Sequence, residues 1–341
     1  MSKKKRLIIP FYINHKGCPE KCVFCDQSII SGQEDTIPSS DNLETGIVSY
    51  LESWQGEGTR EVAFYGGTFT ALPIEIQERL LAAVRPFIDS GEIDAIRVST
   101  RPDAIDEERI HLLRSYGVAT IELGVQSMDD EVLQLSGRGH HSVDTENAAR
   151  LIKSSELTLG CQLMPGLPGD SYKKSMDSAF KVIELGAEIV RIYPALVISG
   201  TEMEKLFFEG SYAPLSMKEA LHLCADMVEV FRANSVHIIR VGLQAEKSLG
   251  DSLVAGPYHP SFGEMVESSI FMKKAQNLLA SCPKLKGDLS LLISPYDESA
   301  LRGQGNANMK ELKEFYPHLK INIKKDCALS RGSLFIQEYN N

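Results

Sequence analysis

Segments with strand-like and helix-like patterns alternate along the chain from Arg6 to Val241, and this alternation predicts an α/β fold built on a parallel sheet. Six strand–helix units and one trailing strand fall within this stretch. Because eight units close a complete TIM barrel, six predict a partial, open barrel of that type. From about Gly250 the pattern changes to a short mixture of helices and strands, which predicts a small α+β appendage. We therefore expect a barrel domain over residues 1–249 and a small C-terminal domain over residues 250–341.

Each element of the barrel is predicted from its own pattern. Strands are predicted where short apolar runs end in polar or glycine-rich turns, at Arg6–Ile13, Glu61–Tyr65, Ala95–Ser99, Val118–Val125, Leu157–Met164, Glu188–Tyr193 and Val236–Val241. Helices are predicted where apolar residues recur at helical spacing, at Ser40–Trp54, Pro73–Phe87, Asp106–Tyr116, Asp129–Leu135, Asp144–Ser154, Asp170–Leu185 and Ser216–Ala233. A doubly wound sheet is the competing fold, and in both folds ligands bind at the carboxyl ends of the strands.

The appendage is predicted from the same signals over a shorter stretch. Its expected helices are Phe262–Leu279 and Asn308–Phe315, and its expected strands are Leu289–Ile293, Leu319–Ile323 and Ser333–Glu338.

Composition narrows the class of protein. The chain has a formal net charge of −10 and a pI near 5.4, which argues mildly against an extensive nucleic-acid surface. Two basic groups, Lys3–Arg6 and Lys320–Lys325, are candidates for phosphate contacts or for ordinary solvated surface. No run approaches the roughly 20 apolar residues that cross a bilayer, and no signal-peptide core follows the basic start. Seven cysteines is an odd count, which together with the missing export signal argues against disulfides. We therefore expect reduced thiols in a cytoplasmic protein, and no membrane partner.

Three cysteines, Cys18, Cys22 and Cys25, lie close together just after the first predicted strand. Thiolates at this spacing can ligate three irons of a [4Fe–4S] cluster, which normally has four cysteine ligands. The iron without a cysteine would be open to another ligand, as the free position of a catalytic zinc site is. Phe24 offers an apolar wall that would shield the cluster from water. A zinc site completed by His15 is one alternative, and purely structural cysteines are another.

Polar or glycine-rich motifs end the next four predicted strands. Gly66 and Gly67 begin GGTF, in which two glycines let backbone groups approach a ligand closely. The other three strand-end motifs are STRPD from Ser99, ELGVQS with Gln126, and MPGLPG from Met164, which follows Gln162. A further motif, GRGH with Arg138, lies after the short helix that follows Gln126. An arginine fork such as that of Arg138 suits a carboxylate.

Glu122 stands out because a carboxylate inside an apolar strand is costly to bury without a purpose. It is a candidate ligand contact. Alternatively, it forms an internal salt bridge with Arg97 or Arg191.

These motifs together resemble a known family. CPEKCVFC, FYGGTFTAL, STRPDAI, ELGVQS, GRGHH, MPGLPGD and RIYPALVISGTEMEKLFFEGSY occur in the order seen in the radical S-adenosylmethionine (SAM) domain of the elongator catalytic subunit. That enzyme modifies the wobble uridine of tRNA. The resemblance covers roughly Arg6–Gln244. Several of the same strings also resemble oxygen-independent coproporphyrinogen oxidases.

The resemblance implies two cofactors, a [4Fe–4S] cluster on Cys18, Cys22 and Cys25, and SAM. The implied SAM contacts are Gly66, Gly67 and Thr68 at the amino group, Gln126 and Arg138 at the ribose and carboxylate, and Gln162 near the ribose or adenine. Four further cofactor-site candidates come from the residues themselves, namely the Met164 backbone at the adenine, Phe24 beside the cluster, and the polar side chains of Ser99 and Glu122. The implied reaction is reductive cleavage of SAM to a 5′-deoxyadenosyl radical, which abstracts a hydrogen atom from the substrate. The implied partners are an electron donor of the flavodoxin or ferredoxin type and, as one candidate substrate, tRNA.

Departures from the family leave the substrate open. The elongator subunit carries an acetyltransferase domain, whereas fewer than one hundred residues follow the predicted barrel here, with no pyrophosphate-binding loop. The segment Ala255–Ser268 resembles bacterial elongator-like proteins of unassigned substrate. A porphyrinogen-oxidase-like enzyme is the alternative within the same chemistry, and a zinc-stabilised binding protein without turnover is the alternative outside it.

Overall fold

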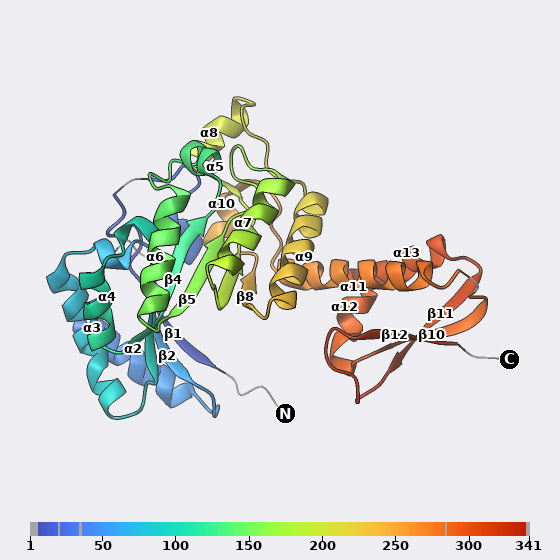
Figure 1. Cartoon of the computed structure of the whole chain (residues 1–341), viewed down its shortest axis with the longest axis horizontal. Helices are drawn as coiled ribbons and strands as arrows, with labels where there is room; N and C mark the ends of the chain where they lie inside the picture. The colour runs from blue at the N-terminus through green and yellow to red at the C-terminus, as the bar shows by residue number, and fades with distance from the viewer. Residues whose placement is uncertain (1–5, 20, 34–35, 284, 339–341) are drawn as a thin grey trace. The chain divides into compact units, whose positions relative to one another are not determined.

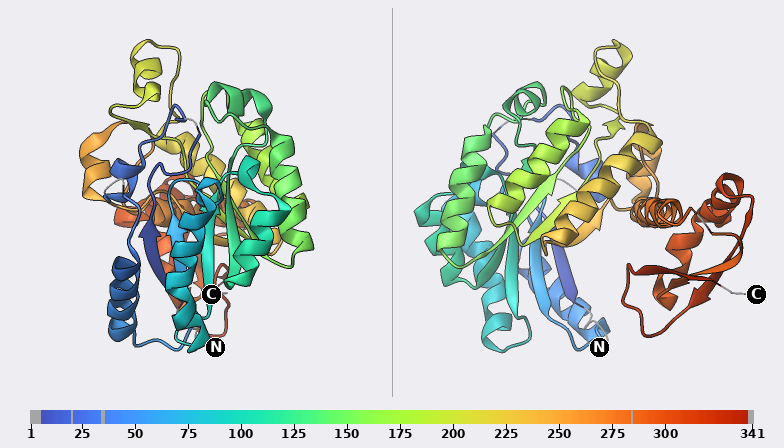
Figure 2. Two further views of the ribbon diagram at one scale, coloured as in Figure 1. Left: turned by 90° about the vertical axis from the view of Figure 1, so that its left-hand side faces the viewer. Right: turned by 45° about the vertical axis from the view of Figure 1, so that its right-hand side comes forward.

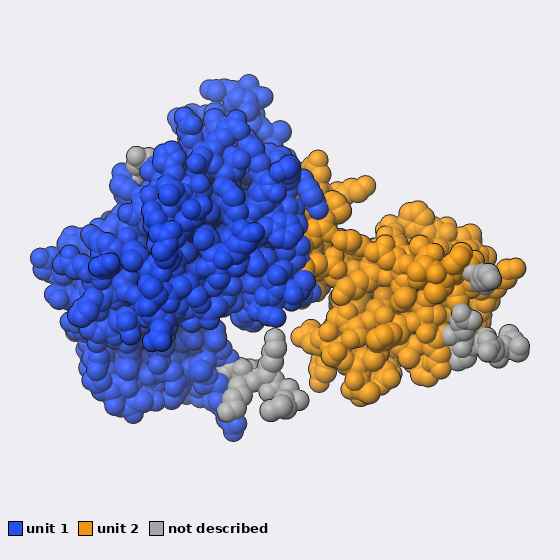
Figure 3. All heavy atoms as spheres, viewed as in Figure 1, with its two compact units in different colours: residues 1–217, 230–258 blue, residues 218–229, 259–341 orange. Residues whose placement is uncertain are grey.

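The structure is a computed structural model that describes residues 6–19, 21–33, 36–283 and 285–338. The chain divides into two compact units, which are coloured separately in Figure 3. Unit 1 comprises residues 1–217 and 230–258, and unit 2 comprises residues 218–229 and 259–341. The domain limits expected from the sequence, 1–249 and 250–341, stay a prediction, because compactness alone does not define a domain that folds by itself.

Unit 1 is built on a seven-stranded parallel sheet whose strands follow one another in chain order, β1-β2-β3-β4-β5-β6-β8 (Figure 1). The strands are β1 Leu7–Tyr12, β2 Arg60–Tyr65, β3 Ala95–Thr100, β4 Val118–Gln126, β5 Thr158–Leu163, β6 Ile189–Ile192 and β8 His237–Val241. The sheet curls into an open half-barrel with helices along its outer side (Figure 2). A doubly wound sheet would need a reversal in strand order, which this sheet lacks. The predicted partial barrel is therefore confirmed.

Helices connect these strands in the predicted rhythm. Those of unit 1 are α2 Ser40–Ser53, α3 Ile74–Asp89, α4 Glu107–Ser115, α5 Asp130–Leu135, α6 Ser142–Ser154 and α7 Tyr172–Glu184, with the shorter α1 Gln27–Ser31, α8 Glu202–Phe208 and α10 Lys247–Ser252. A helix α9, Met217–Ala233, precedes β8, and its residues 218–229 are grouped with unit 2. The sequence reading did not include α1, α8, α10 or the small antiparallel pair of β7 Val197–Ile198 with β9 Leu253–Ala255. These elements span two to seven residues, so any helical or strand period in them is weak.

Strand β4 illustrates how the pattern separates the core from the inner face of the sheet. Ile121, Leu123 and Val125 are fully buried, as expected for side chains that point toward the covering helices. The alternate positions Glu122 and Gln126 are polar and line a pocket on the other face. Because side chains alternate along a strand, one run of residues builds both the apolar core and the polar pocket wall.

Unit 2 is a small α+β structure, as predicted for the appendage. Its strands β10 Gly287–Ile293, β11 Leu319–Lys325 and β12 Leu334–Glu338 form a sheet in the order β11-β10-β12. Helices α11 Phe262–Ala280, α12 Glu298–Arg302 and α13 Ala307–Phe315 accompany it, and together they enclose an apolar core.

The lysines of the second basic group are engaged by neighbouring side chains. Lys320 pairs with Asp288 at 2.9 Å, Lys325 pairs with Glu298, and Lys324 donates to the Gln337 amide at 3.1 Å. In the first basic group, Lys3–Lys5 lie outside the described residues. None of the described helices has the length and apolar character needed to span a bilayer.

Candidate cofactor site

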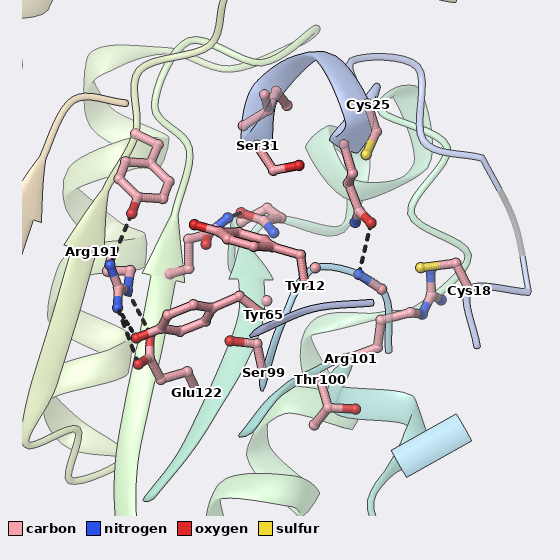
Figure 4. Close-up of a pocket in the computed structure, with 18 of the residues that line it drawn as sticks. Tyr12, Cys18, Cys25, Ser31, Tyr65, Ser99, Thr100, Arg101, Glu122 and Arg191 are labelled. Atoms are coloured by element: carbon pink, nitrogen blue, oxygen red, sulfur yellow. Dashed lines mark hydrogen bonds and ion pairs between the residues drawn. The ribbon is translucent and has the colours of Figure 1, made fainter. Parts of the chain in front are cut away.

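A pocket of about 440 Å³ opens on the inner side of the unit 1 sheet. Alternate residues of the strands form its wall, for example Tyr65 on β2, Ser99 on β3 and Gln162 on β5. They lie near the carboxyl ends of their strands, where the βα loops gather. Figure 4 shows Cys18 and Cys25 on one side of the pocket and Arg191 on the other. The first side is here named the cysteine end.

The three cysteines come from the loop between β1 and α1, and all three line the pocket. Cys18 Sγ is 3.3 Å from Thr68 Oγ1, and Arg138 Nη1 donates a hydrogen bond to Cys22 Sγ at 3.2 Å. Burial raises the pKa of Cys18 and raises the pKa of Cys25 to about 12. The Cys18 and Cys25 thiols therefore keep their protons at neutral pH, and metal binding would have to displace those protons.

The backbone of the cysteine loop is held from two sides at Val23. Its N–H donates to Ser136 O at 3.1 Å, and its carbonyl accepts from Met203 N at 2.8 Å. Phe24 does not line the pocket, but is buried behind the loop in an apolar cluster, and Met164 packs against the same cluster. Both residues were predicted as cofactor contacts, and these contacts stay a prediction; here they pack in or against the cluster that also contains Cys22.

The paired glycines lie against the start of the cysteine loop. Gly66 and Gly67 have φ of 71° and 59°, a region that favours glycine. A Cβ at Gly67 would lie 2.5 Å from Ile13 O, so a side chain has no room there. Thr68 N donates to Lys16 O at 2.8 Å and ties the two segments together. The glycines that the sequence assigned to ligand approach therefore also let the β2 turn and the cysteine loop interlock.

Gln27 fixes the same junction from α1. Its Oε1 accepts from the backbone N–H groups of His15 and of Gly67, the latter at 2.7 Å. Gln27 N in turn donates to His15 Nε2 at 2.9 Å. His15 thus uses Nε2 to cap this turn, which leaves that nitrogen unavailable as the fourth ligand of a zinc site. Among the described residues, no three His, Cys, Asp or Glu side chains are close enough to share one metal ion. A cluster does not require such closeness, since each cysteine binds a different iron.

Polar residues from β4 and β5 lie beside the cysteine end. Gln126 has φ of 66° at the end of β4, and its Oε1 accepts from Gln162 Nε2 at 3.3 Å. Arg138 Nη2 donates to Gly124 O at 2.6 Å, which fixes the guanidinium over the strand end. Ser99 lines the same wall from β3. The structure therefore gathers into one pocket ten of the thirteen predicted site residues, namely Cys18, Cys22, Cys25, Gly66, Gly67, Ser99, Glu122, Gln126, Arg138 and Gln162.

Glu122 is held by two arginines on neighbouring strands. Its carboxylate is 2.7 Å from Arg97 Nη1 and 2.6 Å from Arg191 Nε, and Arg97 continues to Glu61 at 2.5 Å. Burial pushes the pKa of Glu122 up, but Arg191 and Arg97 outweigh it, so this pKa lies below its usual range. The internal salt bridge weighed from the sequence is present, and Glu122 also lines the pocket.

Tyrosines form the side of the pocket away from the cysteines. Arg191 donates to Tyr65 Oη at 2.8 Å and to Tyr193 Oη at 3.1 Å, so one guanidinium orients both hydroxyls. Burial raises the pKa of Tyr65, which keeps its proton at neutral pH. Tyr12, Tyr65 and Gln27 also line the pocket but were not among the site residues predicted from the sequence. The only signal for Tyr12 and Tyr65 was their position at the ends of alternating strands.

Two family models match the chain. The Radical SAM superfamily matches residues 12–180, and the Radical_SAM C-terminal domain matches residues 187–271. The chain belongs to the radical SAM superfamily. Its cofactors are accordingly a [4Fe–4S] cluster and SAM.

The chain is similar to several proteins whose names denote different activities. It is 34% identical over 256 residues to tRNA uridine(34) acetyltransferase of Methanocaldococcus jannaschii, covering 63% of this chain and 47% of that protein. It is 27% identical over 201 residues to Heme chaperone HemW of Haemophilus influenzae, covering 57% and 52%. The archaeal Methanocaldococcus infernus Elp3, solved with an N-terminal deletion, matches with a TM-score of 0.63 at 24% identity, covering 80% and 63% of the two chains. The chain spans about half the length of both named relatives.

The residues of the cysteine end fit the cofactors of the family. Three thiols are the donors that iron–sulfur clusters use. Arg138 Nε is buried and lacks a hydrogen-bond partner in the described part of the chain. An unpaired buried guanidinium N–H is costly, and an anionic ligand would satisfy it.

Proposed function

We propose that the chain is an elongator-like radical SAM enzyme whose cluster is ligated by Cys18, Cys22 and Cys25. The observation that carries this proposal is their convergence with Gly66 and Gly67 on one pocket. Thr68 Oγ1 lies 3.3 Å from Cys18 Sγ, so the glycine turn and the cysteine loop are in direct contact. A ligand of an open iron at the cysteine end would therefore lie close to the glycine turn.

When bound, the cluster and SAM together supply an electron and a 5′-deoxyadenosyl radical that takes a hydrogen atom from the substrate. The chain's own residues bind and orient. Backbone carbonyls of Gly66 and Gly67 would suit an ammonium group, and the Arg138 guanidinium suits a carboxylate. Gln126, Gln162 and Ser99 offer hydrogen bonds for the ribose and adenine, and the apolar cluster behind Phe24 keeps water away from the thiolates.

For the substrate, we propose an RNA of the tRNA class. The support is the similarity to tRNA uridine(34) acetyltransferase, which covers less than half of that protein. The electron would come from a donor of the flavodoxin or ferredoxin type. Similarity to Heme chaperone HemW favours a second candidate, a tetrapyrrole-related role, at lower identity.

Anaerobic reconstitution with iron and sulfide tests the cofactor proposal. We expect about four irons per chain and release of 5′-deoxyadenosine when SAM and dithionite are added. A fully loaded protein that releases none would contradict the radical chemistry. Deuterium transfer into 5′-deoxyadenosine then separates the substrate candidates, since label from perdeuterated tRNA supports RNA and label from a deuterated porphyrinogen supports the second candidate.

A further inference from the structure

Arg101 is a second buried arginine at the cysteine end, and none of the assignments above uses it. It follows β3 and has only 4% of its surface exposed. Asp103 holds it by a two-pronged pair, with Arg101 Nε donating to Oδ1 at 2.9 Å and Nη2 donating to Oδ2 at 2.8 Å. This two-pronged pair fixes the guanidinium plane and leaves Nη1 as the nitrogen that does not contact Asp103.

Arg101 Nη1 is buried and has no hydrogen-bond partner within the described residues. Arg101 lines the pocket, and Figure 4 shows its side chain reaching to the side where Cys18 lies. Arg138 presents a similar edge, because its two Nη atoms bond Cys22 Sγ and Gly124 O while Nε lacks a partner. Two guanidinium groups therefore each present one unsatisfied buried N–H at the same end of the pocket.

Among the described residues that contact these two guanidinium groups, positive charge exceeds negative charge. Arg101 and Arg138 bring two positive charges, while Asp103 is the carboxylate that contacts one of them. His140 is buried nearby and adds no charge, since burial and then Arg138 lower its pKa to about 3. Buried guanidinium N–H groups without a partner are unfavourable, so the two unpaired donors suit an anion.

We propose that Arg101 is an anion-binding residue of this pocket, held by Asp103 and donating from Nη1 to the negative charge that the cofactors bring to the cysteine end. The inference rests on the proposed function. Two sources of that charge share the chemistry, the carboxylate of SAM and the thiolate-ligated cluster. Asp103 acts through Arg101 and is a positioning residue.

The test compares wild type, Arg101→Gln and Arg109→Gln after anaerobic reconstitution. Arg109 is a matched control, because it is held by Asp106 and by Thr70 O but does not line the pocket. Two quantities are measured besides turnover, the dissociation constant of SAM by equilibrium dialysis and the midpoint potential of the SAM-free cluster by a titration followed by electron paramagnetic resonance.

If Arg101 binds the carboxylate, Arg101→Gln weakens SAM binding by about tenfold to a hundredfold, the loss expected for one charge-assisted hydrogen bond, and leaves the SAM-free potential unchanged. If it faces the cluster, the potential becomes more negative, because a reduced cluster loses a neighbouring positive charge. Arg109→Gln should match wild type in both. Wild-type values for Arg101→Gln in both measurements overturn the inference while the proposed function stands.

If the wild-type protein takes up no cluster, that result contradicts both the proposed function and this inference. If only Arg101→Gln fails to load, Asp103→Asn replaces it, because that variant keeps the arginine charge and removes the carboxylate that orients it. We expect a smaller change in the same quantity. Values equal to wild type for Asp103→Asn then contradict the inference.

Discussion

A single methyl group at Gly67 tests whether the glycine turn and the cysteine loop depend on each other. Gly67 has φ of 59°, and a Cβ there would lie 2.5 Å from Ile13 O and also overlap Lys16 O. A residue with a Cβ loses about 1–2 kcal/mol in the left-handed region. Because both clashing atoms belong to the backbone, the loop itself must move, which costs about 1–3 kcal/mol more. Gly67→Ala should therefore lower the free energy of unfolding by about 2–5 kcal/mol.

Gly91→Ala separates these two costs. Gly91 has φ of 76°, but a Cβ there would meet nothing within 4 Å, so only the backbone cost of about 1–2 kcal/mol applies. Trp54, the sole tryptophan, lies in unit 1 and reports its unfolding by urea through fluorescence. Iron uptake is measured in parallel, and only Gly67→Ala should reduce it. Equal stability and equal iron content in the two variants would refute the interlocking of the turn and the loop.

Three further outcomes are expected from other parts of the site. Glu122→Gln should cost about 3–5 kcal/mol at pH 7, because it leaves two buried arginines short of a carboxylate. Since the pKa of Glu122 is lowered from 4.5, wild type has this stability above that pH and loses it as the pH falls through the lowered pKa. Urea unfolding from pH 7 to pH 3 should show the gap between the two proteins narrowing, and a constant gap would contradict the ion pair. Cys22→Ser should abolish the cluster absorbance near 400 nm while the circular dichroism stays that of wild type, and full iron content would remove Cys22 from the ligands. His15→Ala should keep the iron and sulfide stoichiometry but lower loop stability through the lost bond from Gln27 N, whereas loss of all metal would support a histidine ligand.

The periodic features of the sequence were sufficient to predict the fold. The alternation of strands and helices predicted a parallel sheet in chain order, and the β4 pattern of Ile121, Glu122 and Leu123 marks one buried and one polar face. Such periodicities arise from local backbone geometry, which is the same in every chain. The grouping of motifs at strand ends was also predictable, because parallel strands bring their carboxyl ends to one edge. The positions of Cys18 and Gln126 after predicted strands were thus enough to predict that both belong to one site.

Contacts between side chains far apart in the sequence could not be read in this way. Arg97 and Arg191 were both weighed as partners of Glu122, but only the curl of the sheet brings the two onto one carboxylate. Phe24 was expected to form an apolar wall, and which residues it packs with, among them Val132 and Met203, is seen only in the folded loop. The direction of a loop side chain depends on what packs around it, and no local period encodes that.

The unpaired Nη1 of Arg101 is another feature that could not be predicted from the sequence. In the sequence, Arg101 and Asp103 form an ordinary charged pair at a strand end. Burial turns the pair into a fixed guanidinium with one unsatisfied N–H, because removal from water makes an unpaired donor costly. The residue types and their order thus specified the barrel and the cofactor class. Which charges are paired and which are left for a ligand was settled by long-range packing, since only the folded chain excludes water from them.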